Sequence, residues 1–440
     1  MDADRRAGPA AGKPAGDGAA TAPAARHPPV PLRRNRDFNL LWTGQAVSLL
    51  GSQMSLIAYP LLVLIATGSA AQAGIVGGAT LVGPLVTLLP AGVVADHYPR
   101  KRILVLTSAV QMIVVATVVP AALTHHVYLA HLASVGLIQG VASAFYLGAS
   151  RGSVRRIVPP EQLHAALSRM YARDNGAALV GPPAGGALFG LAAFLPFAAD
   201  SVSFGAIAAA AALIRARLDP DPADPNGATA PREPVRRAVT RGMRFVLGQP
   251  YLRTVAIWST AVNSVAAGML LMVIVLARSK GATPVVIGAM MSINAGCGLA
   301  GALAAPRLNK MIGGRRMALT TSWLLPTCAV GIAYAPSVWL IALFGALTTF
   351  TIMPVNVAFQ ARATRITPDE LQAQAGNAQQ LFSVSLSWLA PPVFGVLTDS
   401  ISARSAMLIA AGLYLLTAVW LQRSTELHGL DEELLPSAAH

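Results

Sequence analysis

The sequence predicts an all-α membrane protein with twelve transmembrane helices in two six-helix bundles and both chain ends in the cytoplasm. Three observations support this fold class. The 440 residues are 54% hydrophobic and only 12% charged, whereas about a quarter of a soluble domain is charged. The apolar residues form continuous runs long enough to cross a bilayer as helices. The basic residues fall almost entirely on one side of these runs.

Twelve apolar runs of membrane-crossing length follow a first segment, 1–37, that is rich in Ala, Pro, Gly and Arg. We expect this segment to be a disordered, basic cytoplasmic tail, because it has no apolar core that could serve as a signal peptide. The expected spans are 38–66, 74–95, 103–123, 128–150, 166–190, 193–214, 251–277, 285–306, 317–335, 338–358, 376–398 and 402–422.

The Lys and Arg residues fix the predicted orientation. With the N-terminus inside, 30 of the 33 basic residues lie in cytoplasmic segments, and only Arg278, Lys280 and Arg404 lie outside. This distribution follows the positive-inside rule. The net charge of +14 is therefore mainly topological and does not indicate nucleic-acid binding, although part of it suits the anionic lipid of the inner leaflet.

One long cytoplasmic segment, 215–250, divides the chain into an N-terminal bundle, 38–214, and a C-terminal bundle, 251–422, before a tail at 423–440. Its prolines at 219–227 exclude a helix in its first half. Its second half alternates arginines with apolar residues, so we expect a basic amphipathic helix at 235–247 on the inner leaflet.

An internal repeat supports two equivalent bundles. The stretch 180–188, with a Pro-Pro pair, corresponds to 389–397, and 156–159 corresponds to 365–368 at the same offset of 209 residues. Six-span repeats that run in the same sense are one known plan of secondary transporters.

At this point the chain resembles the major facilitator superfamily. The loop 92–102 resembles the superfamily's loop between helices two and three, with His97 where an Arg is usual. The run that begins at Gly176 resembles the helix-five motif of its antiporters and drug exporters, and 34–45 resembles the branch that contains the enterobactin exporter. Many proton-driven exporters have an Arg where this chain has Gly136, so a proton relay through that arginine is not carried over.

The loop between helices two and three contains the residues that the resemblance implies as a conformational latch. Asp96 at a helix end can accept hydrogen bonds from Arg or from the N-terminus of helix eleven in the other bundle. The plainer interpretation is a basic flank of a membrane span. The latch residues are Gly92, Asp96, Arg100 and Lys101.

The helix-five motif is expected to pack helices closely or to act as a hinge that seals the cavity. Small residues allow close approach of helices, and Pro bends the backbone. Its residues are Gly176, Gly181, Pro182, Pro183, Gly185 and Gly186.

Three residues are candidates for a proton site. Asp200 lies inside span 193–214, where an ionisable residue is a functional candidate, unless it sits at the outer interface. Asp174 follows Arg173, and the two are also expected as an interfacial charge pair. His131 lies near the outer end of its span and can equally be an interfacial residue.

Polar residues at helical spacing form a stripe on four spans that line the central cavity in the superfamily. Amide and hydroxyl groups suit a polar cargo without a fixed charge, and the alternative is hydrogen bonding between helices. The stripe comprises Gln45, Ser48, Ser52, Gln139, Ser143, Tyr146, Ser259, Asn263, Thr349, Asn356 and Gln360.

These features predict a secondary exporter of a small amphiphilic molecule such as a siderophore, a peptide-like metabolite or a drug, driven by proton antiport. We expect a monomer in the cytoplasmic (inner) membrane of a bacterial-type cell, with no enzymatic activity, cofactor or metal, since no nucleotide-cradling motif or ligand cluster is present. Cys297 and Cys328 lie in apolar runs and are expected to be inert. The alternatives are an importer of a small metabolite and a non-transporting sensor or scaffold.

Overall fold

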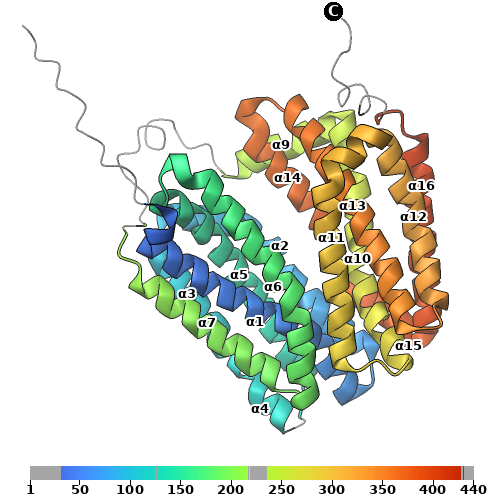
Figure 1. Ribbon diagram of the computed structural model, residues 1–440, viewed down its shortest axis with the longest axis horizontal. Coiled ribbons are helices and arrows are strands. Elements are labelled where there is room, and N and C mark those ends of the chain that lie inside the picture. Colours follow the sequence, from blue (N-terminus) through green and yellow to red (C-terminus); the bar gives the residue numbers. More distant parts are fainter. Residues whose placement is uncertain (1–30, 125, 217, 219–234, 428–429, 431–440) are drawn as a thin grey trace, which may run out of the picture.

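The computed structural model describes residues 31–124, 126–216, 218, 235–427 and 430, without the side chains of residues 88, 89, 92, 93, 95, 96, 235, 236 and 238. These residues form helices joined by short connections (Figure 1). The first bundle comprises η1 (Leu32–Arg34), α1 (Arg36–Thr67), α2 (Ala70–His97), α3 (Arg100–Ala116), α4 (Val118–Leu123), α5 (Leu129–Ile157), η2 (Pro160–Gln162), α6 (Leu163–Leu191) and α7 (Leu195–Leu213). Then follow α9 (Val235–Gly248), α10 (Pro250–Ser279), α11 (Pro284–Ile312), α12 (Gly314–Tyr334), α13 (Val338–Ile366), η3 (Asp369–Leu371), α14 (Gln372–Val384), α15 (Ala390–Ser400) and α16 (Ala403–Arg423).

Ten of the described helical segments are long and apolar enough to cross a membrane. They match the predicted spans except 166–190 and 376–398. The first of these lies in α6, a long helix that carries Arg169, Arg173 and Asp174 in its first half. The second is not the single helix that we predicted, because it is divided between α14 and α15. Residues 32–37, which we assigned to the tail, form η1 and the start of α1.

Prolines contribute to the break before α15. Pro391 and Pro392 have no N–H, so the carbonyls of Ser387 and Trp388 lose their helical donors. The chain passes through turns at 385–389, where Ser387 N bonds the Val384 carbonyl at 3.1 Å in the tighter i to i+3 pattern.

Short polar side chains fix where several helices begin. The side chains of Asn35, Ser69, Thr283, Ser337 and Ser402 each accept a hydrogen bond from a backbone N–H in the first turn of the helix that follows. These N-caps satisfy donors that have no partner within the helix. The connections can therefore remain short, which keeps consecutive helices adjacent.

The two bundles meet at one end and separate at the other (Figure 1). Within the first bundle, α1 packs against α6 and α7, and α5 packs against α2 and α3. Within the second, α11 and α12 pack against α13, and α10 packs against α15 and α16. The helix α9 packs against α14 and α10, so it belongs to the second bundle. The end at which α2 packs on α15 and α6 packs on α11 is called the closed end, and the opposite one, with α9, the open end.

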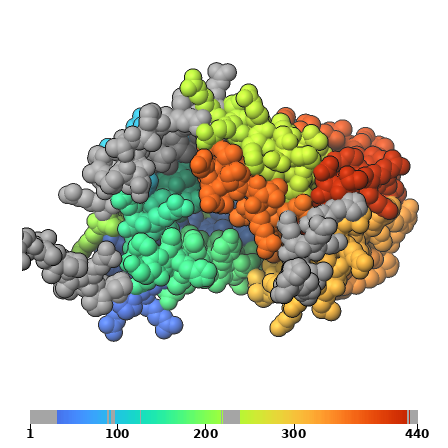
Figure 2. Space-filling view, turned by 90° about the horizontal axis from the view of Figure 1, so that it is seen from above, coloured from blue at the N-terminus to red at the C-terminus, as the bar shows by residue number. Residues whose placement is uncertain are grey.

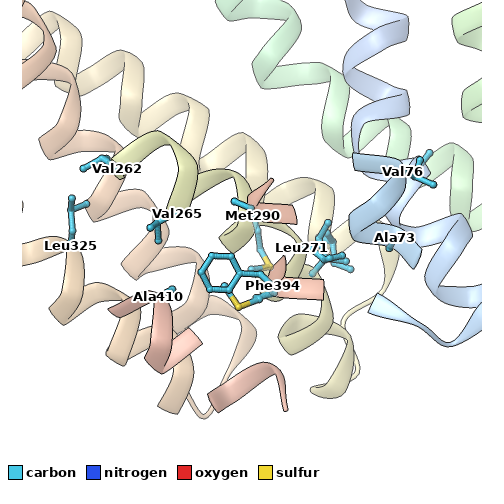
Figure 3. Packing of buried hydrophobic residues seen from close by; sticks show 14 of the residues in the cluster. Ala73, Val76, Val262, Val265, Leu271, Met290, Leu325, Phe394 and Ala410 are labelled. Atoms are coloured by element: carbon cyan, nitrogen blue, oxygen red, sulfur yellow. The ribbon is translucent and has the colours of Figure 1, made fainter. Parts of the chain in front are cut away.

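Phe394 of α15 marks the apolar core near the closed end. It is buried, and its ring lies against Gly268 of α10, where a Cβ atom would collide with it. Figure 3 shows it close to Leu271 and Met290, with Ala73 of α2 on the facing bundle. The core of the second bundle thus continues to the surface that receives the first.

Candidate functional site

The helix-five motif forms one of the two most extensive contacts between the bundles. Gly186 of α6 lies so close to α11 that a Cβ atom there would collide with the backbone carbonyl of Pro284. In the same way, a Cβ atom on Gly288 of α11 would collide with the carbonyl of Pro182. Gly181 and Gly185 approach α1, whereas Gly176 has nothing within 4 Å. Most of the motif therefore packs helices at the closed end, but Gly176 does not.

The other contact between the bundles repeats this geometry with α15 and α2. A Cβ atom on Gly395 would collide with the Ala70 carbonyl, and one on Gly74 with the Pro391 carbonyl. Gly395 and Pro391 are the residues that the 209-residue offset pairs with Gly186 and Pro182. The internal repeat thus corresponds to two similar backbone crossings that close one end of the molecule.

A hollow lies between the bundles at the open end. Figure 2 looks onto this end and shows the space between the first bundle and the helices α9 to α16. The contacts at the closed end form its floor. A space open on one side and sealed on the other is the arrangement that alternating access requires.

Asp200, near the start of α7, is fully buried, with 0% of its surface exposed. Its Oδ1 accepts hydrogen bonds from Ser52 Oγ of α1 at 3.3 Å and from Ser203 Oγ at 3.5 Å. Its Oδ2 has no hydrogen-bond partner among the described residues. Burying a carboxyl group is costly unless it is paired or neutralised by a proton. Asp200 is thus a buried acid whose carboxyl group faces uncharged polar side chains.

The surroundings of Asp200 connect it to the polar stripe. Ser52 is half-buried and belongs to that stripe. Tyr59 of α1 interacts electrostatically with Asp200 and donates a hydrogen bond to Gln139 Oε1 of α5 at 3.3 Å. Two residues of the polar stripe, Ser52 of α1 and Gln139 of α5, therefore lie near Asp200.

The second acidic candidate is already paired. Arg173 donates to Asp174 Oδ1 from Nε at 2.9 Å and from Nη2 at 2.7 Å, and it also donates to Gln45 Oε1. The Arg173 side chain is only 8% exposed and that of Asp174 is 50% exposed. Gln45 in turn donates to Ser150 Oγ at 2.5 Å. Gln45 thus links α1, α5 and α6, which is the interhelical role that we gave as the alternative to cavity lining.

The remaining stripe residues divide into two groups. Ser143, Asn263, Asn356 and Gln360 are exposed and free to face a cargo, while Ser48, Tyr146, Ser259 and Thr349 are half-buried. Thr349 donates to the Asn294 carbonyl of α11 at 3.0 Å, and Ser259 bonds its own helix. The exposed amides are therefore Asn263 of α10 and Asn356 and Gln360 of α13.

His131 is half-buried in α5, and its Nε2 lies 2.9 Å from Thr117 Oγ1. Thr117 stands between α3 and α4. This contact joins neighbouring elements of one bundle, as expected of an interfacial residue.

The loop between α2 and α3 is anchored within the first bundle. Arg100 Nη1 donates to the Gly152 carbonyl of α5 at 3.4 Å, and Lys101 Nζ donates to the Ile214 carbonyl after α7 at 2.8 Å. Gly92 and Asp96 belong to α2, but their side chains lie outside the described residues. The latch between bundles therefore stays a prediction.

Residues near the start of α1 have a role that we did not assign from the sequence. Asp37 accepts hydrogen bonds from the backbone N–H groups of Arg215 at 3.2 Å and Ala216 at 2.8 Å. Asn35 donates to the Ile157 carbonyl at the end of α5 at 3.0 Å. Asp37 and Lys101 thus fasten the chain as it leaves the first bundle, and Asn35 joins the start of α1 to the end of α5. Their position in the motif 34–45 was the only sequence signal.

We expect Asp37→Ala to lower stability. The substitution leaves the amides of Arg215 and Ala216 without their acceptor, which costs about 1–2 kcal/mol when a partly buried charged acceptor is lost. Thermal unfolding of the purified protein in detergent should show a lower midpoint than the parent. Glu370→Ala, at an exposed carboxylate, is the control and should unfold like the parent. An unchanged midpoint for Asp37→Ala would mean that the anchor contributes nothing.

The described residues form two similar helical bundles, with paired glycine crossings at one end and a hollow at the other, which is the fold of major facilitator proteins. Solved structures support this class. A mutant of the nucleoside transporter NupG superposes with a TM-score of 0.73 at 12% identity, covering 88% of this chain and 99% of NupG. A bacterial homologue of the human lysosomal transporter Spinster, inward-facing and unoccupied, gives 0.73 at 12% identity, covering 92% and 100%.

Sequence comparison assigns the chain to one family. The family described as transmembrane secretion effector matches residues 27–440. The chain therefore belongs to this family of the major facilitator superfamily and is a transporter. Among curated relatives, the multidrug efflux pump Tap of Mycolicibacterium fortuitum is 27% identical over 397 residues, which cover 86% of this chain and 93% of Tap.

Proposed function

We propose that the protein exports small amphiphilic molecules from the cytoplasm by alternating access, driven by proton antiport. Siderophores, peptide-like metabolites and drugs are the cargo classes that this proposal includes. Its relationship to a multidrug efflux pump over nearly the whole length of both chains supports export. The exposed amides Asn356 and Gln360 in α13 support a cargo that is recognised by hydrogen bonds without a fixed charge.

The proposal assigns the open end to the cytoplasm. The open end carries the linker helix α9 and the C-terminal end of α16, which the charge distribution assigns to the cytoplasmic side (Figure 1). In this orientation the hollow faces the cytoplasm and can take up cargo there. The crossings of α6 with α11 and of α2 with α15 then close the outer side of the membrane.

The observation that carries the coupling mechanism is the isolated carboxyl group of Asp200. Its burial, the uncharged hydroxyl groups of Ser52 and Ser203 beside it and its unpartnered Oδ2 support protonation as the way to neutralise it. Ser52 belongs to both this site and the polar stripe, so occupation by cargo and by a proton can influence each other through α1. If cargo and proton are bound alternately, each transport cycle exports cargo and admits a proton.

The test of export compares cells that lack their own efflux pumps with and without this protein. Internal concentrations of a panel of siderophores and drugs are measured by mass spectrometry. Export predicts lower internal amounts of at least one compound, and this reduction should disappear when a protonophore collapses the gradient. Higher internal amounts would favour an importer. No change for any compound, with the protein present in the membrane, would favour a non-transporting sensor or scaffold.

The driving ion is tested separately in everted membrane vesicles. Cargo should accumulate when the vesicle interior is acidic, and a sodium gradient at constant pH should have no effect. Accumulation with the sodium gradient alone would contradict proton antiport while leaving export intact.

A further inference from the structure

Asp399 makes a polar contact between the bundles at the closed end. It lies near the end of α15, and its carboxylate reaches the start of α2 in the other bundle. Its Oδ2 accepts hydrogen bonds from Ser69 Oγ at 2.7 Å and from the Ala71 N–H at 2.9 Å. Its Oδ1 accepts from the Ala70 N–H at 2.8 Å. One carboxylate therefore binds three donors of the opposite bundle.

The start of α2 is well suited to bind an anion. The first N–H groups of a helix have no partner within the helix, and they carry a partial positive charge. Ser69 is the N-cap of α2, and its side chain accepts from the Gln72 N–H at 3.2 Å while its hydroxyl proton goes to Asp399. The carboxylate thus completes the cap of a helix that belongs to the facing bundle.

This contact has no equivalent at the other crossing. Asp399 lies four residues after Gly395, which is the glycine of its crossing. Four residues after Gly186, the corresponding glycine of α6, stands Gly190, which has nothing within 4 Å of a built Cβ atom. The helix α11 is capped by its own Thr283, which accepts from the Val286 N–H at 3.4 Å. Backbone packing is shared by both crossings, but a charged contact is present at only one of them among the described residues.

We propose that Asp399 is a closed-end latch: it holds the start of α2 in the conformation described here and must release it before this end of the transporter can open. The proposal rests on the alternating access stated above, but not on the identity of the cargo. The three hydrogen bonds join only elements that move apart in that transition. They therefore stabilise one state and not the other, which is the condition for shifting a two-state equilibrium.

The test measures opening of the closed end at a distance from Asp399. Spin labels are attached to Gly190→Cys on α6 and Arg278→Cys on α10, in a background with Cys297→Ala and Cys328→Ala. Both labelled positions are exposed and lie on different bundles at the closed end. In the purified protein, Asp399→Ala should raise the population with the long label distance relative to that with the short one about two- to fivefold, the range expected for an exposed charge at a helix N-terminus.

Graded variants separate a latch from a loss of folding. Asp399→Asn keeps one acceptor and should give a smaller increase, and Ser69→Ala removes a single donor and should give the smallest. Asp369→Ala is the matched control, because its carboxylate accepts from Gln372 Nε2 at 2.9 Å within its own bundle. Unchanged distances in both Asp399 variants would overturn the latch. Since the measurement uses no cargo, its result stays independent of whether export is demonstrated.

Discussion

Asp200→Asn should abolish cargo accumulation driven by a pH gradient. The amide has nearly the size of the carboxyl group and can still accept the hydrogen bond from Ser52, but it cannot carry a proton. In everted vesicles with an acidic interior, the parent should accumulate cargo and the variant should not, a loss of at least about tenfold for an essential proton carrier. Exchange of labelled for unlabelled cargo, which needs no net proton movement, should continue.

Asp174→Asn is the control for this experiment. Asp174 is half-exposed and paired with Arg173, so its removal changes a charge in the same bundle without touching the buried site. We expect it to keep most of the gradient-driven accumulation. If the pH gradient drove as much cargo accumulation with Asp200→Asn as with the parent, but not with Asp174→Asn, the proton site would have to be assigned to Asp174.

Gly186→Val should block transport by preventing closure. The added side chain would collide with the Pro284 carbonyl and the Val285 backbone, both of which belong to the other bundle. Overpacking of a tight contact costs about 1–3 kcal/mol, so the closed end should be disfavoured by roughly one to two orders of magnitude. The rate of cargo transport in vesicles should fall accordingly, while the protein still inserts and purifies as a folded monomer.

Gly190→Val is the control that separates the loss of the tight contact at Gly186 from a general effect of valine in α6. It lies one turn further along α6, is exposed and has nothing within 4 Å of a built Cβ atom, so the valine is expected to be tolerated. Equal loss of transport in both variants would show that β-branched residues simply disturb α6. Full activity of Gly186→Val would mean that the crossing does not seal the cavity.

Hydropathy and charge predicted most of the helices. In lipid, every backbone N–H and C=O group must find its hydrogen-bond partner within the protein, so a long apolar run has to be a helix. The break in span 376–398 was not predicted, since both repeats carry a Pro-Pro pair and α6 remains continuous through Pro182 and Pro183. The two repeats differ in the turn before the Pro-Pro pair. The second repeat has serines there, and Ser385 Oγ donates to the Phe382 carbonyl at 2.8 Å. The serine hydroxyl thus competes with backbone N–H groups for a carbonyl that a continuous helix would use.

The candidate site was predicted less completely. The small residues of the helix-five motif were identified, but the sequence did not reveal that Gly176 takes no part in a close contact. Asp200 was recognised as an acid within a span, whereas its burial depends on the packing of α7 against α1. Asp399 was missed because it follows the predicted span by one residue, and its donors, near Ser69, are more than 300 positions away in the chain.

The anchors at both ends of the linker have a mechanical consequence. Asp37 and Lys101 hold the chain at 214–216 to the first bundle, and α9 is fixed to α14, where Arg241 Nε donates to Gln374 Oε1 at 2.8 Å. The stretch between Ala216 and Val235 can reach about 60 Å when extended. This maximum length is set by the number of residues alone. Cutting the chain between these anchors should leave two polypeptides that still assemble through the glycine crossings and the Asp399 contact at the closed end.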